Sequence, residues 1–129
     1  MLRLNNSDDT IVAISTPLGQ GAIGIVRLSG KDAISIADQM FISKKGERAS
    51  QFKNFALHYG QVIKDKEMID EALLTVMRAP ASYTKEDMVE ISSHGGIVSL
   101  RAILTRALDL GARLAEPGEF TKRAFLNGR

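Results

Sequence analysis

The clearest indication of the fold class lies in residues 88–111, MVEISSHGGIVSLRAILTRALDLG, because the hydrophobic period changes within this stretch. Residues 88–93 have the composition of a short strand with Glu90 inside it, and a glycine pair follows. Apolar residues then recur at helical spacing as far as Gly111, a natural position for a helix to stop. These helical apolar positions are Ile97, Leu100, Ile103, Leu104, Ala107 and Leu108. The stretch therefore predicts a strand that turns directly into a helix.

Further strands are expected upstream of this stretch, with few helices between them. Their β-branched and apolar residues occupy four ranges, namely 10–15, 22–28, 55–64 and 69–78. A short helix is expected over 31–40, with Ser29 or Gly30 as its cap and Ala33, Ile36 and Ala37 on one face. Residues 42–54 are polar and show no period, which predicts a loop, and 79–87 form another connection.

The C-terminal segment predicts one more helix, from Gly118 or Glu119 to Leu126, in which Glu119 and Arg123 have i,i+4 spacing. Because several strands follow one another directly and the helices do not alternate strictly with them, the pattern indicates an α+β fold. We expect a mixed or antiparallel sheet packed by two or three helices, in one domain over residues 1–129. The pattern is still helical and charged at the last residue, which predicts a chain that belongs to a longer protein.

Composition excludes several classes of site. The chain has 129 residues, 44% hydrophobic and 25% charged, which is typical of one globular domain. It contains no Cys, which removes disulfides, thiolate metal sites and Cys nucleophiles, and its two His (His58 and His94) exclude a three-histidine zinc site. No metal site is therefore expected. With no apolar run of the ~20 residues that a membrane span needs and no signal peptide, an intracellular protein is the default expectation.

The charge distribution gives weak evidence for an anionic partner. The formal net charge is +2, and residues 101–129 hold six basic against three acidic side chains. This segment is the part most suited to face an anion, although a solvated helix face is the simpler interpretation.

A G-x-G-x-x-G sequence occurs at Gly19–Gly24, after a predicted strand. In a dinucleotide-binding fold the third glycine lies in a helix, whereas here Ile25-Val26-Arg27-Leu28 favour a strand. A glycine-rich hairpin loop is the better interpretation. The chain also lacks the G-x-x-x-x-G-K-[ST] loop of P-loop nucleotide hydrolases.

Two charged residues lie inside predicted strands. Arg27 either faces solvent or meets an acid or ligand, and the two alternatives are about equal. Glu90 poses the same question, and a carboxylate can accept two parallel hydrogen bonds from the amino-pyrimidinone edge of a pterin or guanine. His94, Gly95 and Gly96 lead into the predicted helix, where free N–H groups can meet an anion, although a tight strand-to-helix turn is the simpler interpretation. No nucleophilic triad is supported, and no catalytic residue is assigned.

Three stretches together resemble the N-terminal domain of the MnmE (TrmE) family of tRNA-modification GTPases. They are DTIVAISTPLGQGAIGIVRLSG at 9–30, SYTKEDMVEISSHGG at 82–96 and EPGEFTKRAFLNGR at 116–129. The resemblance implies a fold like the folate-binding domain of the glycine-cleavage aminomethyltransferase. It also implies binding of a tetrahydrofolate derivative, 5-formyl- or 5,10-methylene-tetrahydrofolate, and homodimerisation through this domain.

Carried over to this sequence, the family's folate contacts are Arg27, Glu90 and Arg129. His94, Gly95 and Gly96 are possible neighbours of the folate pocket. In the family the full-length cytoplasmic protein hydrolyses GTP, with Mg and K, in a GTPase domain that this sequence does not include. With the FAD-dependent partner MnmG (GidA), it builds a carboxymethylaminomethyl-type group on the wobble uridine (U34) of tRNA, and the folate supplies the one-carbon unit.

The leading hypothesis is therefore a folate-binding and dimerisation module that is not catalytic on its own. The alternative is a module that binds tRNA directly through the basic 101–129 segment. Its small net charge and aromatic content of only 5% argue against that alternative. A third reading, a self-contained aminomethyltransferase or dehydrogenase, lacks a complete set of reacting groups.

Overall fold

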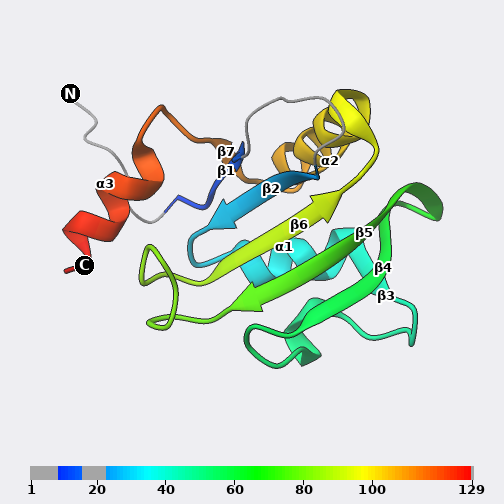
Figure 1. Cartoon of the computed structure of the whole chain (residues 1–129), viewed down its shortest axis with the longest axis horizontal. Coiled ribbons are helices and arrows are strands. Elements are labelled where there is room, and N and C mark those ends of the chain that lie inside the picture. Colours follow the sequence, from blue (N-terminus) through cyan, green and yellow to red (C-terminus); the bar gives the residue numbers. More distant parts are fainter. Residues whose placement is uncertain (1–8, 16–22, 129) are drawn as a thin grey trace.

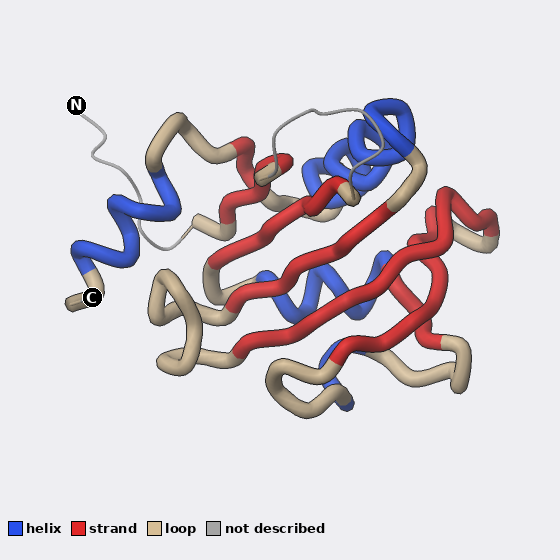
Figure 2. The backbone as a smooth tube through the Cα atoms, in the orientation of Figure 1, coloured by secondary structure: helices blue, strands red, loops and turns tan. Residues whose placement is uncertain are grey.

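The computed structural model describes residues 9–15 and 23–128, which form one seven-stranded sheet with helices. The strands are β1 Ile11–Ile14, β2 Gly24–Ser29, β3 Phe41–Ser43, β4 Leu57–Lys64, β5 Glu67–Met77, β6 Met88–Ser93 and β7 Arg113–Leu114. The helices are α1 Ala33–Met40, the 3₁₀ turn η1 Ala49–Gln51, α2 Gly96–Asp109 and α3 Glu119–Leu126. Figure 1 shows their arrangement, and Figure 2 shows the strands lying side by side with α1 behind them.

The sheet has the order β3-β4-β5-β6-β2-β1-β7. All of its neighbouring strands are antiparallel except β1 and β7, which are parallel. A mixed sheet with three α-helices confirms the predicted α+β class and is consistent with the aminomethyltransferase-type fold. None of the helices among residues 9–15 and 23–128 is long and apolar enough to cross a membrane.

The hydrophobic core lies between one face of the sheet and the helices α1 and α2, which Figure 1 shows packed on the same side. Side chains alternate between the two faces of a strand, so every second residue of the central strands is buried there. Fully or almost fully buried members of this core include Val26 and Leu28 of β2, Leu74 and Val76 of β5, Val89 and Ile91 of β6, Met40 of α1 and Ile103 of α2. The intervening residues of these strands point to the opposite face, which α1 and α2 do not cover.

The long elements begin and end close to the predicted positions, and the differences have local causes. The expected cap of α1 was Ser29 or Gly30, but the N-cap is Asp32. Ser29 cannot leave the sheet because it pairs with Ile11 of β1, and Gly30 has a φ of +142° beside Thr10. The chain therefore needs two more residues to turn into the helix.

Two short strands were missed in the sequence. The predicted loop 42–54 is wrong at its start, because β3 runs through Ser43 and pairs with β4, and η1 lies within the same range. The strand β7 has only two residues, yet both pair with β1. A strand of two or three residues has too few positions to show a period, so only its partner identifies it.

Gly24, the last glycine of the G-x-G-x-x-G sequence, is the first residue of β2, so the dinucleotide-binding context is absent. The hairpin loop proposed for the earlier part of that sequence lies outside the described residues. At Gly24 a Cβ atom would overlap the side chain of Leu100, which is buried under the sheet in α2. This glycine allows α2 to approach β2 closely.

We therefore predict that Gly24→Ala lowers the free energy of unfolding by about 1–3 kcal/mol through overpacking. Leu100→Ala alone should cost about 2–5 kcal/mol because it leaves a cavity. In the double variant the added methyl occupies part of that cavity, so the combined loss should fall short of the sum by about 1 kcal/mol or more. Urea denaturation of the four proteins measures this, and strictly additive losses would show that the two positions do not touch.

Candidate functional site

The strand charges singled out in the sequence, Arg27 and Glu90, are direct partners across β2 and β6. The Nε of Arg27 donates to Oε2 of Glu90 over 2.8 Å, and its Nη2 lies 2.7 Å from the same oxygen. Both side chains are about a quarter exposed (28% and 25%) and lie on the sheet face away from α1 and α2. Of the two alternatives for Arg27, the structure therefore supports the one in which it meets an acid.

This ion pair leaves hydrogen-bonding capacity unused. Both contacts of Arg27 fall on Oε2, and Oε1 of Glu90 has no hydrogen bond within the described part of the chain. An ionised carboxylate offers about four lone-pair positions, so Glu90 can accept further N–H donors while Arg27 holds it in place. The arrangement is suited to a ligand that presents neighbouring N–H groups.

A hollow of about 480 Å³ opens beside Arg27. Besides Arg27 of β2, its walls come from three further segments, the end of β1, Tyr83 in the 79–87 connection, and residues 115–121 at the start of α3. The guanidinium carbon of Arg27 lies 5.6 Å from the centre of the Phe120 ring, a cation–π distance. Ser15, at the edge of the hollow, has a buried hydroxyl without a hydrogen-bond partner among the described residues. The cavity thus combines a cation, two aromatic rings and an unsatisfied hydroxyl.

The wall formed by α3 is held by a buried carboxylate. Glu119 is 4% exposed and accepts hydrogen bonds from Nη1 and Nη2 of Arg113 at 3.1 and 2.7 Å. It also accepts from the backbone N–H of Glu116 at 2.9 Å. Arg123 lies 3.5 Å away at the predicted i,i+4 position. The hydrogen bonds from Arg113 lower the pKa of the Glu119 carboxyl, while the same contacts raise the pKa of Arg113.

A second set of contacts joins α3 to the 79–87 connection. Arg123, 3% exposed, donates to Oε1 of Glu86 over 3.1 Å, and Glu86 accepts from Ser29 of β2 over 2.8 Å. Ser29 also exchanges a hydrogen bond of 2.7 Å with Thr84. Tyr83 lies 3.1 Å from Thr121 of α3, hydroxyl to hydroxyl. These contacts determine the positions of Tyr83 and Phe120 beside Arg27.

The third expected folate contact, Arg129, lies outside the described residues, and α3 ends at Leu126. No prediction was made for Phe120 and Tyr83, because sequence spacing does not reveal that α3 and the 79–87 connection meet beside β2. Among residues 9–15 and 23–128, no group of three or more His, Asp or Glu side chains is placed to hold a metal ion. His58, the other histidine, lies in β4 and stacks on Phe52 with ring centres 3.6 Å apart.

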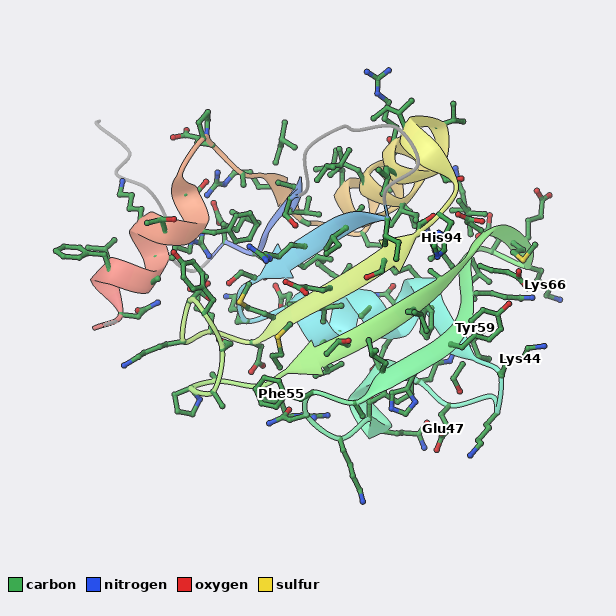
Figure 3. The ribbon with its side chains drawn as sticks, viewed as in Figure 1. Lys44, Glu47, Phe55, Tyr59, Lys66 and His94 are labelled. Atoms are coloured by element: carbon green, nitrogen blue, oxygen red, sulfur yellow. The ribbon has the colours of Figure 1, made fainter. Side chains whose placement is uncertain are left out.

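His94 and Gly95 line a different hollow, of about 390 Å³, at the start of α2. Figure 3 shows His94 and Tyr59 there, and Ser92 and Leu73 are further lining residues. This hollow shares no lining residue with the one beside Arg27. Ser92 lies on the same face of β6 as Glu90, two residues along. That His94, Gly95 and Gly96 are neighbours of the folate stays a prediction.

Comparison with known proteins identifies relatives over nearly the whole chain. The family described as "GTP-binding protein TrmE N-terminus" matches residues 10–129. A tRNA modification GTPase MnmE from Listeria welshimeri is 59% identical over 121 residues, and one from Geobacillus kaustophilus is 56% identical over 123 residues. Each alignment covers 94% of this chain but only 26% and 27% of the relative. A protein of the same name from Lactococcus lactis is 54% identical over 99% of this chain and 28% of its own length. The chain therefore spans about a quarter of the length of these relatives.

The pKa of Glu119 leads to a prediction about acid stability. A carboxyl whose pKa is lower in the folded state stabilises the fold above its unfolded value, near 4.5, and this contribution is lost as the pH falls through the folded value. We expect the urea midpoint of the wild type to fall below about pH 4.5, and Glu119→Gln to be less stable at pH 7 and to show a weaker fall. Glu67→Gln, at an exposed position of β5, serves as the control and should follow the wild type. Parallel pH curves for wild type and Glu119→Gln would contradict this role of the carboxylate.

Proposed function

This chain belongs to the family described as GTP-binding protein TrmE N-terminus, and from that premise we propose that it is the tetrahydrofolate-binding and homodimerisation module of a tRNA-modification GTPase. The relatives named tRNA modification GTPase MnmE support the role in tRNA modification. In this proposal the module supplies the one-carbon unit for carboxymethylaminomethyl formation on the wobble uridine (U34), as a 5-formyl- or 5,10-methylene-tetrahydrofolate.

The observation that carries the proposal is the Arg27–Glu90 pair beside a hollow with aromatic walls. Glu90 accepts the amino and ring N–H donors of the pterin, with Oε1 available for the first of them. Arg27 and Arg129 meet carbonyl or carboxylate oxygens elsewhere on the folate. The hollow of about 480 Å³ is in the usual range of roughly 300–1,000 Å³ for small-molecule sites, and Phe120 and Tyr83 offer ring surfaces to the pterin or the aminobenzoate.

The remaining parts of the activity belong to other components. The module itself contributes no catalytic residue, and it binds and orients the folate. GTP hydrolysis with Mg and K takes place in the GTPase domain of the full-length cytoplasmic protein. The FAD-dependent partner MnmG (GidA) shares the modification reaction, and tRNA is the substrate of their complex.

Calorimetric titration with 5-formyltetrahydrofolate tests the assignment of residues. Loss of one charge-assisted hydrogen bond, about 1.5–3 kcal/mol, should weaken binding roughly 10- to 100-fold in Glu90→Gln, Arg27→Ala and Arg129→Ala. Two matched controls remove a carboxylate and a guanidinium at positions away from the site, Glu67→Gln on β5 and Arg101→Ala on α2. Both should bind 5-formyltetrahydrofolate like the wild type.

Thermal unfolding of each variant shows whether the fold is intact, since Arg27 and Glu90 also stabilise each other. Unchanged affinity in Glu90→Gln and Arg27→Ala, with intact folds, would reject the site. Sedimentation equilibrium on the same samples should give twice the 14.1 kDa chain mass, and a monomer at calorimetric concentrations would reject homodimerisation by this chain.

A further inference from the structure

A third hollow, of about 340 Å³, lies between the outer side of α2 and the β4–β5 hairpin. Figure 1 shows the start of α2 and the hairpin at the same end of the sheet, and Figure 3 labels Lys66 in the hairpin turn. The polar residues of the hollow are Lys64 of β4 and Arg101, Thr105, Arg106 and Asp109 of α2. Three cationic side chains thus converge on one hollow that contains a single carboxylate.

The side chains of these three cations make fewer hydrogen bonds and ion pairs within the chain than the remaining described arginines do. Arg27, Arg113 and Arg123 pair with carboxylates, and Arg48 and Arg78 donate to backbone carbonyls. Within residues 9–15 and 23–128, Arg101 is the one arginine whose side chain makes no hydrogen bond or ion pair. It is exposed, as is Lys64, whose side chain also has no polar partner in the same part of the chain.

Arg106 contributes in a different way. Its Nε donates to the carbonyl of Ile63 over 3.2 Å, which joins α2 to the hairpin and fixes the direction of the guanidinium. No other described residue accepts from its Nη groups, so they remain available to a ligand. A guanidinium group held in this way loses less side-chain entropy on binding an anion than that of an unrestrained arginine does.

The chemistry of the hollow fits a phosphodiester. Two guanidinium groups, one ammonium and the Thr105 hydroxyl are all hydrogen-bond donors to phosphate oxygens, and such contacts position nucleic acids irrespective of sequence. The hollow is separate from the Arg27 cavity, with which it shares no lining residue and which lies on the sheet face away from α2. A folate bound at Arg27 therefore leaves it accessible.

We propose that Lys64, Arg101 and Arg106 bind backbone phosphates of RNA. This inference rests on the proposed function, because tRNA is the RNA that a tRNA-modification enzyme meets. Of the basic residues in the 101–129 segment, the proposal assigns only those on one side of α2 to the RNA contact, together with Lys64 of the hairpin. The basic residues of α3 make no RNA contact in this proposal.

The test is fluorescence anisotropy of a labelled, unmodified tRNA transcript titrated with this chain over a range of salt concentrations. Each phosphate contact adds about 0.7–0.9 to the slope of log affinity against log salt. Arg101→Gln and Lys64→Gln should each reduce the slope by about that amount and weaken binding, and the double variant should reduce it by about 1.5. Arg106 is left unchanged because it also joins α2 to the hairpin.

The matched control is Lys122→Gln, which removes an exposed cation of α3 from the same basic segment. It should leave the affinity and the slope as in the wild type. An equal loss of tRNA affinity in Lys122→Gln, or no loss in Arg101→Gln and Lys64→Gln, would overturn the proposal. Inorganic phosphate should compete no better than chloride at matched ionic strength, and strong competition would overturn it in favour of a small-anion site.

Folate calorimetry on the same variants separates the two proposals. Arg101→Gln and Lys64→Gln should bind 5-formyltetrahydrofolate like the wild type, and weaker folate binding would mean that the substitutions act through the fold. If folate binds normally and Arg101→Gln and Lys64→Gln still bind tRNA like the wild type, the RNA inference fails while the folate assignment stands.

Discussion

The position of α3 depends on one buried carboxylate, that of Glu119, which lies between the guanidinium groups of Arg113 and Arg123. A charge at 4% exposure is costly unless it is paired and hydrogen-bonded, and removing Glu119 would leave Arg123, 3% exposed, with fewer counter-charges. Since Arg113 belongs to β7 and also meets Asp9 at 3.0 Å, the cluster connects the edge of the sheet to the helix. This interaction builds the helix-side wall of the candidate site.

The functional consequence lies in what α3 carries. With the helix docked, Phe120 lies over Arg27, and Arg123 reaches Glu86 in the connection that bears Tyr83. The Arg27–Glu90 pair alone would be an exposed cross-strand ion pair of modest energy, about 1 kcal/mol or less. With α3 and the 79–87 connection in place, Arg27 of the pair lines a cavity in which a ligand can replace water around its partly buried charge.

Much of the fold could be predicted from periodicity, because α2, β5 and β6 are long enough for their apolar residues to show a period. The i,i+4 pair Glu119–Arg123 was predictable for the same local reason. The short strands β3 and β7, the Glu119–Arg113 contact and the Phe120–Arg27 contact were not, because they depend on which distant segments meet. For the site, Arg27 and Glu90 were named through a family resemblance, while their pairing with each other follows from the β2–β6 register.

Folate binding by the Arg27–Glu90 pair and the hollow beside it gives this domain its proposed role. The most direct measurement is NMR of the ¹⁵N-labelled chain during titration with 5-formyltetrahydrofolate, observing the Nε–H resonance of Arg27 and the ring protons of Phe120. We expect saturable shifts of both, with the Nε–H resonance of Arg106, in the hollow beside α2, unchanged. Saturable binding that leaves Arg27 and Phe120 unshifted would contradict it.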